Sequence, residues 1–93
     1  MPPYIPGVTR RELLRILRRL NFAESEGGDH TVFRHRRLGL ITEVPRHSGE
    51  VSPRTVGSIL VQIGLTRAEF DETRRRRGRI PERFREEERH RPW

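Results

Sequence analysis

The spacing of apolar residues changes twice along the chain, and this pattern constrains the fold more than any other feature of the sequence. Apolar residues have helical spacing between residues 13 and 20, alternate with polar residues between 22 and 44, and return to helical spacing between 56 and 63. Only 31% of the 93 residues are hydrophobic, which suits a single small core. We therefore expect one domain in which helices cover a small sheet.

The first helix is predicted over residues 9–20. Thr9 and Glu12 have the spacing of a capping box, in which each side chain bonds the backbone N–H of the other residue. The apolar stripe that follows consists of Leu13, Leu14, Ile16, Leu17 and Leu20. Asn21 is placed to end this helix.

Three short β segments are predicted at residues 22–25, 30–36 and 39–44. The stretch Glu26–Asp29 has the composition of a turn, because its two glycines can take positive φ. Residues 36–39 then make a hairpin of the last two segments. Pro45 ends the third segment, because proline cannot donate a hydrogen bond to a neighbouring strand.

A second helix is predicted with Ser52 as N-cap, Pro53 at its first position and Gly64 at its end. Its apolar stripe consists of Val56, Ile59, Leu60 and Ile63. Thr66 and Glu69 form another capping box, which begins a short third helix. The predicted class is α+β, with the order α-β-β-β-α, a three-stranded antiparallel sheet, helices packed on one face and a short C-terminal helix.

Positive charge is concentrated at one end of the chain. The net charge is +7, and residues 73–93 alone carry nine Arg and four Glu. Such an excess indicates a polyanion or an acidic protein as partner. Because the apolar pattern ends at Phe70, we expect residues 1–72 to form the folded domain and residues 73–93 to form a flexible, Arg-rich tail.

Several classes of protein are disfavoured by the composition. The chain has no cysteine, which excludes disulfides and thiolate metal sites and suits a reducing cytoplasm. No histidines or carboxylates have metal-ligand spacing, so no metal or other cofactor is expected. There is no apolar run of about 18 residues and no secretory leader pattern, so we expect a cytoplasmic protein without a membrane partner.

Three stretches of sequence together resemble a known family. The first is the helix that ends in Leu20-Asn21-Phe22. The second is the run Gly28-Asp29-His30-Thr31-Val32-Phe33-Arg34-His35. The third begins at Val44-Pro45-Arg46-His47-Ser48-Gly49-Glu50 and continues through Thr55-Val56-Gly57-Ser58-Ile59-Leu60 to Gly64-Leu65-Thr66. In this order they resemble the HicA family of toxin mRNA interferases, over roughly residues 9–70.

The resemblance implies a fold like that of double-stranded-RNA-binding domains, an endoribonuclease activity on mRNA, and a HicB-like antitoxin protein as partner. It also implies that His30 is the catalytic residue. The chain departs from the family pattern in two places. Asp29 stands where serine is usual, and residues 36–39 replace a Pro-Asp-Gly turn.

The residues themselves allow the chemistry that the resemblance implies. Histidine suits the proton transfers of a metal-free ribonuclease, because its pKa in peptides lies near neutral pH. In a strand, His30 and Arg34 share one face, while Phe33 and His35 share the other. If Phe33 lies in the core, His30 and Arg34 lie on the open face, where Arg34 can bind the phosphate beside His30. His35 then lies towards the interior or the sheet edge in a structural role.

Further phosphate-binding candidates surround the start of the second helix. Arg46 and His47 precede it, and Ser52 and Arg54 lie at its first turn, where the helix dipole favours an anion. His47 is equally well explained as a solvated loop residue. Two alternatives to a ribonuclease stay open: a non-catalytic RNA-binding module of the same fold, and a degenerate toxin that now serves as a binding partner.

Overall fold

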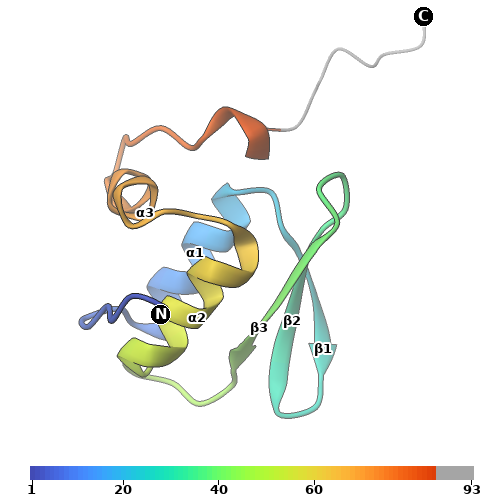
Figure 1. The fold of residues 1–93 in the computed structure, drawn as a ribbon. Coiled ribbons are helices and arrows are strands. Elements are labelled where there is room, and N and C mark those ends of the chain that lie inside the picture. The colour runs from blue at the N-terminus through green and yellow to red at the C-terminus, as the bar shows by residue number, and fades with distance from the viewer. Residues whose placement is uncertain (86–93) are drawn as a thin grey trace, which may run out of the picture.

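The computed structural model describes residues 1–85, and its element order confirms the predicted α+β fold (Figure 1). Helix α1 spans Arg10–Arg19, and the strands β1, β2 and β3 span Ala23–Gly27, His30–His35 and Leu40–Pro45. Helix α2 spans Pro53–Ile63, α3 spans Arg67–Arg74, and a single 3₁₀ turn, η1, spans Glu82–Phe84. Each strand boundary lies within two residues of its prediction.

The three strands form an antiparallel sheet in the order β1-β2-β3, which leaves β1 and β3 as edges. His30, the first residue of β2, pairs with Gly27 on one side and with Pro45 on the other. The turn between β1 and β2 has Gly28 at φ 72°, the positive value that a two-residue turn of this kind requires at its first position. The sheet is thus built from two consecutive hairpins.

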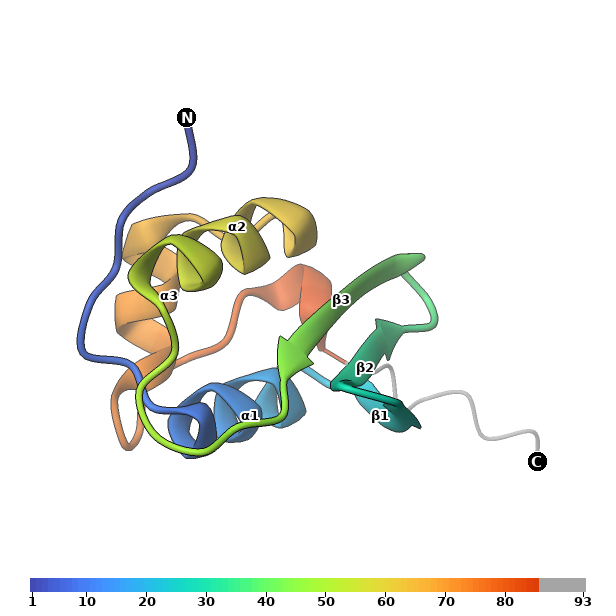
Figure 2. The same ribbon diagram turned by 90° about the horizontal axis from the view of Figure 1, so that it is seen from below.

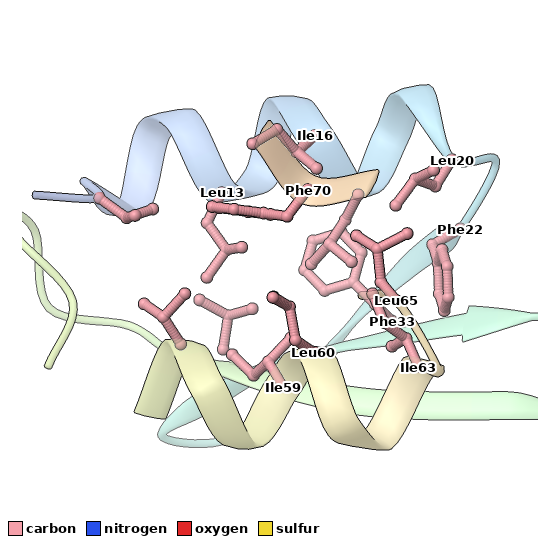
Figure 3. Packing of buried hydrophobic residues seen from close by; sticks show 14 of the residues in the cluster. Leu13, Ile16, Leu20, Phe22, Phe33, Ile59, Leu60, Ile63, Leu65 and Phe70 are labelled. Atoms are coloured by element: carbon pink, nitrogen blue, oxygen red, sulfur yellow. The ribbon is translucent and has the colours of Figure 1, made fainter. Parts of the chain in front are cut away.

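The helices lie on one side of the sheet, as predicted (Figures 1 and 2). In the core, side chains of α1 and α2 face each other, and Phe33 of β2 and Phe70 of α3 lie with them (Figure 3). Phe33 and Phe70 are both completely buried. Burial of the two helical stripes against one sheet face accounts for the fold.

One of the two predicted capping boxes is complete. The Thr66 hydroxyl accepts from the Glu69 N–H at 3.1 Å, and the Glu69 carboxylate accepts from the Thr66 N–H at 3.0 Å. At α1 the Thr9 hydroxyl accepts from the Glu12 N–H at 3.1 Å. The Glu12 side chain instead accepts from Arg74, so the reciprocal bond of that box is replaced by a link between α1 and α3.

The expectation that the core ends at Phe70 is wrong, because Phe84 belongs to it and is completely buried. The Arg19 side chain donates to the Thr73 and Gly78 carbonyls at 2.6 Å each, and Asn21 donates to the Phe84 carbonyl at 2.8 Å. Residues 73–85 therefore pack on the domain. The predicted flexibility of the rest of the tail falls on residues 86–93, outside the part of the chain that the structure describes.

The segment before α1 also contributes to the core, and the sequence pattern did not indicate the burial of Ile5. Ile5 and Val8 are completely buried, and the Ile5 N–H donates to the Pro53 carbonyl at 3.3 Å. Pro3 packs directly on α2 at Gly57, where an added Cβ would lie only 1.7 Å from the Pro3 carbonyl oxygen. This segment is consequently held along the start of α2.

Candidate active site

The two faces of β2 differ as strand parity predicted. Phe33 and His35 are buried on the face towards the helices. On the other face Arg34 is exposed, and the His30 side chain retains 46% of its accessible surface. The prediction that His30 and Arg34 share the open face is therefore confirmed.

His30 lies at a groove between β3 and α2. The groove has a volume of about 650 Å³ and is lined by His30, Ile41, Thr42, Glu43, Pro45, Arg54, Thr55, Ser58, Ile59 and Gln62. The α2 residues recur at spacings of three and four, so they form one face of that helix. The groove exists because β3 is an edge strand and α2 runs beside it.

Glu43 is the residue beside His30 that the sequence analysis missed. Its Oε1 lies 3.9 Å from the Nδ1 of His30, and its side chain is 58% exposed. Glu43 pairs with Val32 across the two strands, which puts it on the open face, diagonal to His30. Only the register of the β2–β3 hairpin reveals this neighbour, because the two residues lie 13 positions apart in the sequence.

Arg10, the first residue of α1, holds the two strands together next to His30. Its Nε donates to the Pro45 carbonyl at 2.7 Å, and its Nη2 donates to the Thr31 hydroxyl at 2.8 Å. Pro45 is the strand partner of His30, and Thr31 is the next residue along β2. The half-buried guanidinium thus ties α1 to both strands at the position of the histidine, a role that sequence reasoning did not anticipate.

Of the predicted phosphate-binding residues, the structure brings only Arg54 into the groove with His30. Arg34 lies on the open face but pairs with Ile41, four positions along the strand from His30. Within residues 1–85 neither arginine forms an ion pair. Both guanidinium groups can therefore meet an anion without breaking a contact to a carboxylate.

Arg46, His47 and Ser52 do not line the groove. The Arg46 side chain pairs with Glu26, and its backbone N–H donates to the Asp29 carbonyl at 3.1 Å, next to His30. His47 is exposed in the loop before α2. Ser52 is the N-cap of α2, as predicted, but its side chain makes no capping hydrogen bond.

His35, the other histidine of β2, is a structural residue, as expected. It is 1% exposed, and its ring contacts those of Phe22 and Phe84 edge-on. The Leu38 N–H donates to its Nδ1 at 3.2 Å, so the neutral ring carries its proton on Nε2, which lies 3.4 Å from the Phe84 carbonyl. Both ring nitrogens are therefore used inside the protein.

Among residues 1–85, no group of three or more His, Asp or Glu side chains is arranged to hold a metal ion. Within the same part of the chain, no helix has the length and apolar character needed to cross a membrane.

The part of the chain that carries this groove matches a known protein family. The model of the HicA toxin family, the toxins of bacterial toxin–antitoxin systems, matches residues 10–65. The chain belongs to the HicA toxin family. No curated protein and no solved structure matches the chain. The match covers the strands and α2, so the groove and His30 lie within the HicA domain, whereas residues 1–9 lie outside it.

Proposed function

We propose that this HicA family toxin is an endoribonuclease that cleaves mRNA, with His30 as its catalytic residue and without a metal cofactor. The observation that carries the proposal is the position of His30, half-exposed at a groove with one carboxylate, Glu43, and one arginine, Arg54. A histidine with these neighbours can exchange protons with a bound phosphodiester and its ribose.

The proposed reaction is an internal transfer within the RNA. His30 removes the proton of a ribose 2′-OH, and the 2′ oxygen bonds to the neighbouring phosphorus while the bond from phosphorus to the 5′ oxygen breaks. The leaving 5′ oxygen takes a proton from water and His30 returns its proton to solvent, so the products are a 2′,3′-cyclic phosphate and a 5′-OH. Glu43 acts as a positioning residue, since a carboxylate near Nδ1 favours a proton on that nitrogen and leaves Nε2 to face the substrate.

The arginines at and near the groove suit the phosphate backbone of an RNA. Arg54 lines the groove, and Arg34 extends the cationic surface along β2. We propose that three residues of the adjoining loop and the start of α2 bind phosphates further along the RNA: Arg46, His47 and Ser52. An mRNA substrate agrees with a protein that acts in the cytoplasm.

A HicB-like antitoxin is the partner that membership in this family suggests. We propose that it covers the groove and presents carboxylates to Arg54 and Arg34, because occupation of the His30 groove is the shortest route to inhibition. A complex in which His30 stays accessible to RNA would contradict this part of the proposal.

The test uses the purified full chain and a single-stranded RNA in excess EDTA. We expect cleavage to persist in EDTA, to yield 2′,3′-cyclic phosphates, and to stop at any site where a single 2′-deoxynucleotide replaces the nucleotide 5′ of the cut. Glu43→Gln should lower the rate of the chemical step more than it weakens RNA binding. Cleavage that requires a divalent metal, or that tolerates the 2′-deoxynucleotide, would contradict the proposed chemistry.

The alternative is a non-catalytic RNA-binding module on the same fold. The observation in its favour is that Arg54 and Arg34 can contact phosphates whether or not the RNA is cleaved. In that case RNA binds the protein and remains intact in every buffer.

A further inference from the structure

A second hollow adjoins the His30 groove on α2. It has a volume of about 440 Å³ and is lined by Met1, Pro2, Pro3, Tyr4, Arg54 and Ser58. Arg54 and Ser58 also line the His30 groove, so the two hollows meet at these two side chains. The surface therefore continues from His30, past Arg54, to the first four residues of the chain.

Tyr4 is the exposed aromatic ring of this second hollow. Its side chain is 64% exposed, although both of its neighbours are anchored. Ile5 is completely buried and bonds the Pro53 carbonyl, while Pro3 packs against the backbone of Gly57. The backbone on both sides of Tyr4 is thus fixed to α2, which holds the ring at a defined place beside Arg54.

We infer that Tyr4 is a stacking platform for an unpaired base of single-stranded RNA, whose backbone passes Arg54 on its way to His30. This inference rests on the proposed function, because it takes the occupant of the groove to be RNA. An exposed aromatic ring beside an arginine is the combination with which proteins bind single strands, the ring for a base and the guanidinium for a phosphate.

The chemistry of the site favours a single strand over a duplex. In double-stranded RNA the bases are stacked on each other, and their faces cannot reach a protein ring. In residues 1–85 the open face of the sheet contributes no Phe, Tyr or Trp side chain, so Tyr4 supplies a large ring that the sheet lacks. Residues 1–9 lie outside the region that matches the family, so the family match does not account for Tyr4.

The test measures equilibrium binding of the wild-type chain and its variants to a 2′-O-methyl single-stranded oligoribonucleotide, which lacks the nucleophile for cleavage. We expect Tyr4→Ala to weaken binding about fivefold or more, the loss typical of one base–aromatic stack. Tyr4→Phe, which keeps the ring, should bind within about twofold of wild type. Val61→Ala removes a 60% exposed apolar side chain of α2 that lines neither hollow, and it should bind as wild type does.

Oligonucleotides with one abasic position identify the stacked base. At one position the abasic substitution should weaken wild-type binding and leave Tyr4→Ala unaffected, because the two changes remove the same contact. Binding of a blunt duplex should not respond to Tyr4→Ala. Equal binding by wild type and Tyr4→Ala, or an equal loss for single strand and duplex, would overturn the inference.

The readout separates this inference from the proposed function, since binding needs no cleavage. His30-dependent cleavage together with an inert Tyr4 overturns the platform alone. Tyr4-dependent binding of single strands without cleavage overturns the ribonuclease and supports the platform. A Tyr4→Ala effect confined to an antitoxin complex, with RNA binding unchanged, would assign the ring to a protein interface and overturn the inference.

Discussion

The two ends of β2 each carry a histidine, and the two side chains lie in opposite environments, one buried and one accessible. His35 is 1% exposed, lies between the rings of Phe22 and Phe84, and has both ring nitrogens within reach of backbone groups. The His30 side chain is 46% exposed and lies beside the carboxylate of Glu43, at the groove between β3 and α2. The same imidazole group is thus buried among aromatic rings at one end of the strand and half-exposed at the other.

The difference follows from what covers each end of the strand. Residues 73–85 pack over the His35 end of the strand, where the Phe84 ring lies beside that of Phe22. At the His30 end α2 runs beside the edge of β3 and leaves a groove. Residue type alone therefore does not show which histidine is accessible, because coverage by distant segments decides which ring a ligand can reach.

The largest effect on stability should come from Phe84→Ala. The side chain is completely buried, so its loss should lower the free energy of unfolding by about 3–5 kcal/mol. Urea unfolding measures this change, with Glu82→Ala, at an exposed position of the same 3₁₀ turn, as the matched control. If Phe84→Ala is as stable as the control, residues 73–85 do not cover the His35 end in solution.

A smaller effect is expected for His35→Ala. This change leaves the Leu38 N–H without its acceptor and opens a cavity beside two phenylalanine rings, for a loss of about 2–3 kcal/mol. The matched control is His47→Ala, an exposed position where the loss should stay within about 0.5 kcal/mol. RNA cleavage per folded molecule should be unchanged in His35→Ala, and a loss of cleavage in that variant would contradict the division between the two ends.

The smallest effect on stability concerns the ion pair that links residues 73–85 to α3. The Arg83 guanidinium donates to both oxygens of Glu69, and this contact lowers the pKa of Glu69 to about 2. A lowered folded-state pKa contributes stability that is present above the unfolded value of 4.5 and is lost as the pH falls through about 2. Glu69→Gln should cost about 1 kcal/mol at pH 7, since the pair is partly exposed.

Unfolding curves of wild type and Glu69→Gln between pH 7 and pH 2 test that expectation. The difference between the two proteins should shrink as the pH falls from about 4.5 to about 2. A difference that stays constant over this range would show that the Arg83 pair does not hold the segment.

The element order was predictable from the sequence because it depends on local signals. Helical spacing, strand alternation, glycine turns and capping residues each act within a few positions, and they placed every strand within two residues. The face on which His30 and Arg34 lie was predictable for the same reason, once Phe33 was assigned to the core.

The parts that the sequence did not reveal depend on contacts between distant residues. Glu43 approaches His30 only through the hairpin register, and Arg10 reaches Pro45 across 35 positions. Phe84 was read as part of a charged tail because its neighbours are charged, yet burial of one large ring is enough to dock the segment. Ile5 escaped notice for a similar reason, as an isolated apolar residue among prolines.

The most direct test of the account compares His30→Ala and His35→Ala side by side, with single-turnover RNA cleavage and urea unfolding measured on each. His30→Ala should stay within about 1 kcal/mol of wild-type stability and still bind RNA, because its side chain is half-exposed and lies outside the core. Its cleavage rate should fall by about 100-fold or more, the loss expected when a positioned acid–base group is removed. A folded His30→Ala protein that cleaves RNA at the wild-type rate would contradict the central claim.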